Sequence, residues 1–583
     1  MEKSYKKYFG RAILTQREPA KPFEFWAWLQ DIPDLAIEVG SLLIAEGENE
    51  RILALVEDME YSTSTADRLA AFYSSGYGNP NVEPRTKPAI IRAVKLRVLY
   101  RDPSRAAPPE GSWGIRAATA EDVEILAQRI PKKWRILAGF LRVGMDESEP
   151  ESWLPLYVHS QYLFGPEGAH ANITGATGLA TKSSYALFLA LSALAWAKQA
   201  GEKTAVVLFN VKQMDFLGLH KMPENWEQAD EWIATWAENI GEAGLTGRTR
   251  AMWKRAVASG VDPLELKPQI RYFTYQGDPD QDQMEEPIIY SYGFDDLEKG
   301  DFMAALFTAS DKVTDPQPTF LHAYLEAKLG RGTSFAKMKD DLAKVTRKGA
   351  EVTVPGVSGS YMSGVVSAVR RRVIGFLSRA TRAVEERRPN GRPVKFAALK
   401  PNSLNVVQLY RLSEAEKRLV FNAVVREISR GLEKPDSPVK RVIVIVDELN
   451  KFAPTGGFSP IKEQIIDVVA RGRSLQFTLI GAQQFASQVD SQVYGNAETK
   501  VVGYSDESEI SNRIYRYLGD LRDQVPNLKK GQMILRHPPY PAPIIFWFPA
   551  PLHVIARIAK AQEIEAPEAE ERWSEIAAEE IPF

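Results

Sequence analysis

The stretch Ile173-Thr-Gly-Ala-Thr-Gly-Leu-Ala-Thr-Lys182-Ser183-Ser184 joins a short apolar run at 170–174 to a long apolar run at 182–199. The first run predicts a strand and the second predicts a helix. Backbone N–H groups of a glycine-bearing loop and of a helix N-terminus together bind phosphate. We therefore predict a phosphate-binding loop over 175–184, with the Lys182 side chain reaching the β- and γ-phosphates.

This loop departs from the usual spacing, in which two glycines stand five residues apart and the second directly precedes the lysine. If the motif is aligned on Lys182, its two glycine positions are occupied by Ala176 and Thr181. If it is aligned on Gly175 instead, the loop is one residue longer than usual, and the turn moves to Gly178. Taken alone, the segment could be an ordinary strand, turn and helix. The residues expected to hold the nucleotide are Gly175, Thr177, Gly178, Leu179, Ala180, Thr181, Lys182, Ser183 and Ser184.

A second signal is Arg441-Val-Ile-Val-Ile-Val-Asp447-Glu448, an apolar strand that ends in two carboxylates. In phosphate-loop enzymes the first carboxylate of such a pair holds Mg²⁺. The second can act as a general base on the attacking water. We expect Mg²⁺ to be bound by Asp447 and by the hydroxyl of Ser183, or of Ser184. The alternative is an ordinary buried strand whose last residues are acidic because they reach solvent. The presence of Lys182 in the other motif argues against this alternative.

The residues after the acidic pair predict a helix at 460–469 and then a strand at 477–480. Arg471 and Arg473 stand near the end of the helical region, and Gln483 and Gln484 follow the strand. A polar side chain at the tip of the neighbouring strand can sense the γ-phosphate, and an arginine can neutralise charge in the transition state. Complementing the dipole at a helix C-terminus is an equally good explanation for either arginine.

The chain alternates strand and helix on both sides of a long helical region, which predicts a parallel sheet with helices on its faces. Short strands in the first part predict a small β-barrel or sandwich. The four predicted parts are a β domain at 1–165, a core at 166–215 and 391–550, a mainly helical insertion at 216–390, and a tail at 551–583. Further predicted strands are 10–15, 35–45, 51–56, 90–100, 134–143, 154–164, 204–209, 270–275, 394–399 and 405–410. Further predicted helices are 63–73, 120–129 and 414–430, the last with a capping box at Ser413 and Glu416.

Composition limits the chemistry. The 583 residues carry a formal net charge of −2 and contain no cysteine, which excludes disulfides, thiolate zinc sites and cysteine nucleophiles. If the chain binds nucleic acid, its positive charge must be concentrated locally. The N-terminus lacks the apolar region of a secretory signal, and the most apolar run, 185–197, is too short to span a membrane. We therefore expect a soluble, cytoplasmic protein without a membrane segment.

Taken together, these motifs resemble the HerA-like hexameric ATPases, relatives of the FtsK DNA pumps. The resemblance includes the phrase at 164–170 ahead of the loop, the segment 210–215 after the second core strand, and the closing run 546–551 before a C-terminal brace. Asp447 and Glu448 match the family's acidic pair, Arg473 its arginine finger, and Gln483 its sensor. Gln484 stands where the family commonly has an arginine.

The resemblance implies a RecA-like ATPase core, an N-terminal HAS barrel, and a hexameric ring that moves double-stranded DNA with ATP and Mg²⁺. Each nucleotide would lie between Lys182 of one subunit and Arg473 of the next. A NurA-like nuclease, or a sirtuin-like or other antiphage effector, would dock on the barrel. Lys212, 337–348 and 370–372 are candidate DNA contacts, although the last is more simply a solvated helix face. An ATP-gated scaffold for an effector is the alternative function, and a membrane-anchored pump or secretion ATPase is disfavoured.

Overall fold

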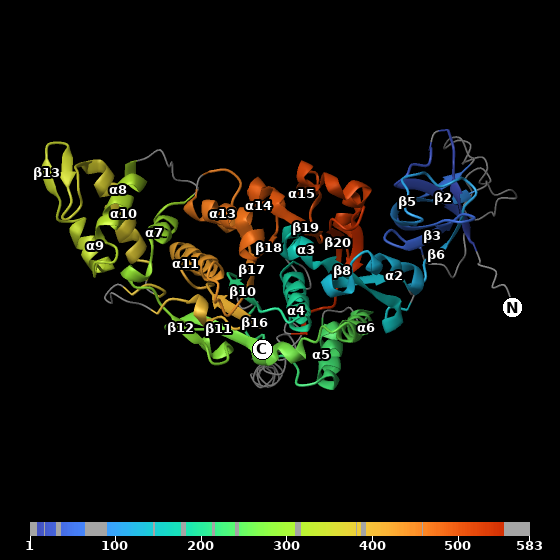
Figure 1. The fold of residues 1–583 in the computed structure, drawn as a ribbon, viewed down its shortest axis with the longest axis horizontal. Coiled ribbons are helices and arrows are strands. Elements are labelled where there is room, and N and C mark those ends of the chain that lie inside the picture. The colour runs from blue at the N-terminus through green and yellow to red at the C-terminus, as the bar shows by residue number, and fades with distance from the viewer. Residues whose placement is uncertain are drawn as a thin grey trace, which may run out of the picture.

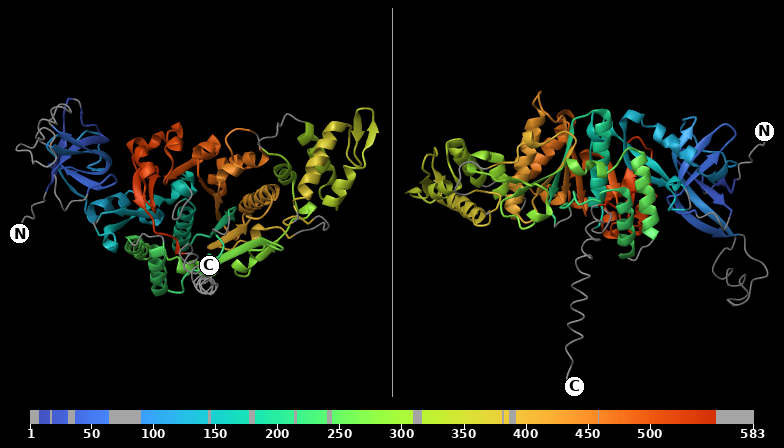
Figure 2. Two further views of the ribbon diagram at one scale, coloured as in Figure 1. Left: turned by 180° about the vertical axis from the view of Figure 1, so that it is seen from behind. Right: turned by 90° about the horizontal axis from the view of Figure 1, so that it is seen from below.

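The structure is a computed structural model, and it describes residues 8–16, 18–30, 37–63, 90–143, 146–176, 182–212, 216–239, 244–308, 316–380, 382–385, 392–457 and 459–552. The molecule is elongated, with a small β-barrel at one end, a large sheet flanked by helices in the middle and a helical lobe at the other end (Figure 1). The view from behind shows the same order of parts (Figure 2). None of the helices in the described ranges has the length and apolar content needed to cross a bilayer.

Six strands close the barrel, in the order β1 (Gly10–Ile13), β2 (Glu24–Leu29), β5 (Ile90–Asp102), β4 (Arg51–Thr63), β3 (Leu42–Glu46) and β6 (Gly114–Ala117). Alternate residues of β2 point inward, as a half-buried strand requires: Phe25 and Ala27 are buried, while Trp28 between Ala27 and Leu29 is exposed. The prediction of a small barrel is confirmed. The helix predicted at 63–73 lies outside the described residues except for Thr63, which ends β4.

The central sheet has twelve strands. Eight of them are parallel, in the order β12 (Ile288–Tyr290), β11 (Ile270–Tyr275), β16 (Ser403–Gln408), β10 (Thr204–Asn210), β17 (Arg441–Asp447), β18 (Phe477–Gln483), β9 (Ala169–Thr174) and β19 (Ala497–Val502). Four antiparallel strands continue one edge: β20 (Gln532–Arg536), β21 (Ile544–Trp547), β7 (Arg135–Arg142) and β8 (Trp153–His159). Every residue of β17 and β18 is buried, because helices cover both faces of a parallel sheet. The predicted α/β fold with a parallel RecA-like core and an N-terminal barrel is confirmed.

Three helices pack on the strands that matter most for the site: α4 (Lys182–Ala200), α11 (Glu414–Leu432) and α13 (Pro460–Leu475). The capping box of α11 is present, with the Ser413 side chain on the Glu416 N–H and the Glu416 carboxylate on the Ser413 N–H. The helix predicted at 414–430 extends two residues further, to Leu432. The shorter helices of this part are α2 (Ala120–Gln128), α3 (Ser160–Phe164), α12 (Leu449–Phe452), α14 (Ser491–Asn496) and α15 (Glu507–Ile510).

Two strand predictions fail for local reasons. Residues 394–399 form no strand, only a 3₁₀ turn at Phe396–Ala398, because Phe396 and Leu399 are three residues apart and one turn buries both. The run predicted at 154–164 divides into β8 and α3, which ends at Gly165 with φ = 96°. The structure also differs from the boundary drawn at 165, since β7 and β8 pair with β21 and so belong to the central sheet.

The region 216–390 is mainly helical, and its elements lie in three different parts of the molecule. Helices α5 (Trp226–Asn239) and α6 (Gly244–Ala258) lie beside the β8 edge, whereas β11 and β12 extend the parallel sheet. The remainder forms the lobe at the far end of the molecule (Figure 1). The lobe elements are α7 (Lys299–Leu306), α8 (Pro316–Lys328), α9 (Phe335–Asp341), α10 (Ser363–Leu377) and a small antiparallel sheet of β13 (Thr346–Lys348), β14 (Glu351–Thr353) and β15 (Tyr361–Met362).

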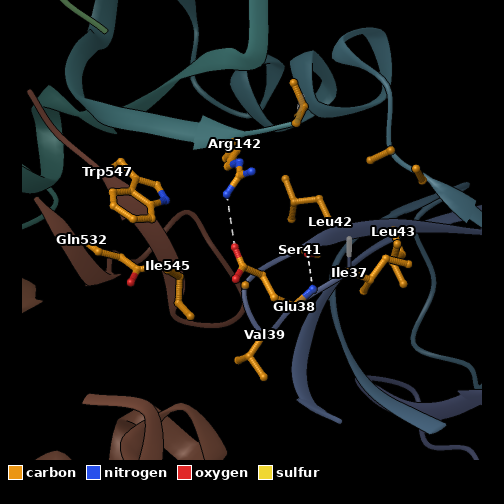
Figure 3. Close-up of a pocket in the computed structure, with 14 residues that line it drawn as sticks. Ile37, Glu38, Val39, Ser41, Leu42, Leu43, Arg142, Gln532, Ile545 and Trp547 are labelled. Atoms are coloured by element: carbon orange, nitrogen blue, oxygen red, sulfur yellow. Dashed lines mark hydrogen bonds and ion pairs between the residues drawn. The ribbon is translucent and has the colours of Figure 1, made fainter. Parts of the chain in front are cut away.

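The barrel meets the central sheet around a cavity of about 100 Å³ (Figure 3). Its walls come from both sides: Glu38 and Leu42 from the barrel, and Arg142, Ile545 and Trp547 from the edge strands. The Arg142 guanidinium lies 3.3 Å from the Glu38 carboxylate across the junction. The contact joins the two parts, although both side chains are partly in solvent and such a pair contributes little free energy.

Candidate nucleotide site

The site lies at one edge of the sheet, where the carboxyl ends of three neighbouring strands meet. Asp447 at the end of β17 is paired in register with Ala482, and Gln483 at the end of β18 is paired with Thr174 at the end of β9. Helix α4 begins at Lys182, after loop residues 177–181, which lie outside the described residues. The structure thus brings the two predicted motifs together despite their distance in the sequence, because β18 pairs with β17 on one side and with β9 on the other.

Ser183 and Asp447 are in direct contact. The Ser183 hydroxyl donates a hydrogen bond of 2.9 Å to Asp447 Oδ2, and the Asp447 carboxylate is buried. Burial raises the pKa of Asp447, while the nearby Lys182 and Lys212 ammonium groups oppose that rise. A hydroxyl and a carboxylate side by side are the hard oxygen ligands that Mg²⁺ prefers, so these residues fit the ion. Of the two serines considered, Ser183 is the one whose hydroxyl contacts Asp447.

Glu448 is held between two lysines. Its Oε1 lies 3.7 Å from Lys182 Nζ and also forms an ion pair with Lys212, which follows the end of β10. Lys182 is buried, and this burial lowers its pKa. The Glu448 backbone has φ = 58° and ψ = 46°, a left-handed conformation that a glutamate rarely adopts. Strain of this kind is typical of functional sites, where the surrounding structure imposes it.

Gln483 forms a closed set of hydrogen bonds with two residues of β9. Its side-chain nitrogen donates to Asn172 Oδ1 at 2.7 Å and to Thr174 Oγ1 at 2.9 Å, and Asn172 donates back to Gln483 Oε1 at 3.3 Å. All three side chains are buried. The predicted sensor is therefore coupled to the strand that enters the phosphate loop, which the sequence prediction did not foresee. Polar residues at alternate positions of an otherwise apolar strand were the available signal.

The first two amides of the loop are engaged by the sheet. The Gly175 N–H donates to Gln483 O at 3.2 Å, and the Ala176 N–H donates to Tyr504 O at 2.7 Å. These bonds fix the entry of the loop relative to β18. The other predicted loop residues, Thr177, Gly178, Leu179, Ala180 and Thr181, lie outside the described residues, and their part in nucleotide binding stays a prediction.

Arg473 lies at the opposite edge of the sheet from the site of its own subunit. It belongs to the last turn of α13, which ends just before β18 begins, and its guanidinium lies 3.5 Å from the Glu498 carboxylate. The buried His170 fixes this turn, since its Nδ1 accepts from the Leu479 N–H at 2.9 Å and its Nε2 lies 2.9 Å from Val469 O. Burial lowers the pKa of His170 to about 4, so the ring is neutral at pH 7.

Lys212 is a site residue that the sequence analysis did not assign to the nucleotide site. The sequence offers it as a candidate DNA contact, and the structure pairs its ammonium group with Glu448 inside the candidate nucleotide site. The strand that carries it, β10, lies directly beside β17, so the position after its end faces the acidic pair. Adjacency of β10 and β17 is a property of the topology, and no local pattern around residue 212 reveals it.

The parallel sheet, the connection from β9 to α4 at its edge and the acidic end of β17 give the chain the α/β fold of a RecA-like P-loop core. No protein-family model matches the chain, and no curated protein matches it in sequence. Among solved structures, the bacterial conjugative coupling protein TrwB is similar over 74% of this chain and 92% of its own, with 11% identity and a TM-score of 0.33. TrwB bound to the GTP analogue GDPNP is similar over 75% of this chain and 93% of its own, with 12% identity and a TM-score of 0.33. The genome-packaging NTPase B204 of Sulfolobus turreted icosahedral virus 2 covers 26% of this chain and 69% of its own, with 14% identity and a TM-score of 0.21.

Proposed function

We propose that the chain is an ATP-driven translocase of double-stranded DNA that acts as a closed ring of identical subunits. The observation that carries the proposal is the contact of Ser183 with Asp447 beside Glu448, at the place where α4 and β17 meet. A magnesium ligand pair next to a second carboxylate is what hydrolysis of a nucleoside triphosphate requires.

Each residue of the candidate site would have its own role in ATP hydrolysis. Lys182 would bind the β- and γ-phosphates, and Ser183 and Asp447 would hold Mg²⁺, which supplies charge neutralisation at the phosphates. Glu448 would orient the attacking water and accept its proton. Gln483, hydrogen-bonded to Asn172 and Thr174, would report the state of the phosphates to β9. Before Glu448 can act as a base, its ion pair with Lys212 has to loosen.

The position of Arg473 supports a shared site. Its helix ends at the amino edge of the sheet, so it serves a nucleotide only if a neighbouring subunit presents that nucleotide to this edge. We propose a hexameric ring in which Lys182 of one subunit and Arg473 of the next enclose each ATP. The six-stranded barrel, as a HAS barrel, would dock a NurA-like nuclease or an antiphage effector such as a sirtuin-like enzyme. The ring would then work in DNA end processing or in antiphage defence.

A triplex-displacement assay tests translocation. A short third strand is bound to one end of a long duplex, and its release is followed after addition of ATP and Mg²⁺. We expect release that depends on ATP, on Mg²⁺ and on Lys182, because a protein that moves along the duplex strips the third strand. Release that is no faster with ATP than with a non-hydrolysable analogue, for the chain alone and with its partner, would show that the chain does not translocate.

A second candidate function is an ATP-gated scaffold that assembles an effector and moves DNA little. The ion pair between Lys212 and Glu448 favours it, because a general base neutralised by a lysine is held in a resting state. In that case ATP would drive assembly with the partner, and hydrolysis would be slow. ATP-dependent co-elution with the effector, without triplex release, is the result that would favour the scaffold.

The Lys212→Ala substitution tests whether the ion pair restrains hydrolysis. We expect the ATPase rate without DNA to rise by about fivefold, because a partly exposed ion pair contributes at most about 1 kcal/mol and 1.4 kcal/mol corresponds to a tenfold change in rate. Steady-state phosphate release measures the effect, with Lys212→Arg as the control that keeps the charge. A rate below that of the wild type would mean that Lys212 assists the reaction and does not restrain it.

A further inference from the structure

The lobe at the end of the molecule farthest from the barrel is strongly basic. Residues 316–380 contain eleven lysines and arginines against four acidic residues, which gives this segment a formal charge of +7. The whole chain carries −2, so the other residues together carry −9. The positive charge of the protein is therefore concentrated in one part, as binding to a polyanion requires.

Most of these basic side chains are exposed and make no ion pair. Lys328 pairs with Asp341 at 2.8 Å, and Arg372 donates to Gln317 Oε1 and to Leu306 O, each at 3.1 Å. Over 316–380, all of which the structure describes, the other nine have no recorded carboxylate partner. These nine are Arg331, Lys337, Lys339, Lys344, Arg347, Lys348, Arg370, Arg371 and Arg379. A surface that only keeps a protein soluble usually carries both signs of charge in similar numbers, whereas here basic residues outnumber acidic ones by eleven to four.

A packed core holds these charges in place. Val366, Val369 and Val373 are buried along one side of α10, and the rings of Phe335 and Phe376 lie 6.2 Å apart between α9 and α10. Tight turns carry some of the basic residues outward. Gly330 and Gly332, at φ of 71° and 65°, flank Arg331, and neither has an atom near its missing Cβ. The lobe therefore presents its charges from a folded unit.

The lobe is also joined firmly to the helices beside the nucleotide site. Asp301 of α7 is fully buried and accepts from Arg426 at 2.7 Å and from Asn422 at 2.8 Å, both on α11. Arg418 of α11 donates to Ala304 O at 2.9 Å. Since α7 packs on α11 and α13, and α13 packs on β18, the lobe is in direct contact with a helix that covers the strand next to β17.

We infer that this basic lobe binds the phosphate backbone of double-stranded DNA. The inference rests on the proposed function and places the DNA contact on the lobe. It removes Lys212 from the candidate contacts, because that side chain pairs with Glu448. Within the run 370–372, Arg370 and Arg371 are exposed and remain candidate DNA contacts. Arg372 is hydrogen-bonded within the lobe and does not. Contacts from lysine and arginine to phosphate carry no information about the bases, so binding is independent of DNA sequence.

The test removes four exposed charges from the full-length chain: Lys337→Ala, Lys339→Ala, Arg347→Ala and Lys348→Ala. Binding of a labelled 30-base-pair duplex is measured by fluorescence anisotropy, without ATP, over a range of salt concentrations. The matched control removes four exposed charges elsewhere: Lys254→Ala, Lys400→Ala, Lys434→Ala and Arg516→Ala. A second version of the test variant uses glutamate at the four lobe positions. The DNA-free ATPase rate shows that each variant is folded.

We expect the lobe variant to bind at least about tenfold more weakly, with the slope of log K against log salt smaller by about 2 to 4, because each lost phosphate contact removes about 0.9 from that slope. The glutamate version should bind more weakly still, and the control should bind as the wild type does. Unchanged affinity in both lobe variants, or an equal loss in the control, overturns the inference. An acidic protein as the true partner of the lobe would give this unchanged affinity.

The outcomes separate this inference from the proposed function. If the wild type binds duplex through the lobe but shows neither DNA-stimulated hydrolysis nor triplex release, translocation fails and the lobe assignment stands. If triplex release is normal in both lobe variants, the lobe assignment fails and translocation stands.

Discussion

Replacing Glu448 with glutamine is expected to slow ATP hydrolysis by about 10²- to 10⁴-fold, the usual contribution of a general base. The amide keeps the size of the side chain but cannot accept the proton of the attacking water. Ser183, Asp447 and Lys182 remain, so ATP and Mg²⁺ should still bind. The variant should therefore hold ATP in the ring without turning it over.

Phosphate release and retention of radiolabelled ATP on the isolated protein measure the two parts of this expectation. Glu433→Gln is a suitable control, because Glu433 is an exposed carboxylate that pairs with Arg471 away from the site. A Glu448→Gln rate within about threefold of the wild type would mean that another group activates the water, and the assignment of Glu448 would be wrong.

Replacing Arg473 with alanine is expected to slow hydrolysis by about 10³-fold or more, the effect of losing an arginine finger. The side chain is half-exposed, and its only recorded ion pair, with Glu498, is at 3.5 Å, so the fold should tolerate the change. Arg471→Ala is the matched control. Arg471 is two residues away and equally exposed, but it pairs with Asp467 and Glu433 of its own subunit, and its loss should leave the rate near that of the wild type.

Mixing two inactive variants tests whether Arg473 acts across a subunit interface. Lys182→Ala subunits keep Arg473, and Arg473→Ala subunits keep Lys182. In a mixed ring some interfaces contain both intact residues, so we expect hydrolysis to return partly on mixing. If Arg473→Ala alone hydrolyses ATP nearly as fast as the wild type, the shared site is refuted.

Several elements of the central part were predictable because their signals are local. The apolar run before Asp447, the capping box at Ser413 and the strand at 270–275 depend only on neighbouring residues, and the structure has each of them. The turn at Phe396–Ala398 was misread because its apolar residues fit both a short strand and a turn. Local periodicity cannot separate these two for so short a run.

What could not be predicted depends on contacts between distant segments. Strands β7 and β8 belong to the central sheet because β21, close to the other end of the chain, pairs with β7. Lys212 meets Glu448 because β10 lies beside β17, and Gln483 meets Asn172 because β18 lies beside β9. The ends of these strands were each recognisable as polar. Which of them face one another was fixed only by the strand order.

The most direct test of the account is the steady-state ATPase rate of the full-length chain, with and without duplex DNA, beside that of Lys182→Ala. The account predicts that the wild type hydrolyses ATP, that duplex DNA raises its rate several-fold, and that the Lys182→Ala rate stays at background in both conditions. Hydrolysis by Lys182→Ala at the wild-type rate would contradict the nucleotide site, and a wild-type rate that duplex DNA leaves unchanged, with and without a partner, would contradict translocation.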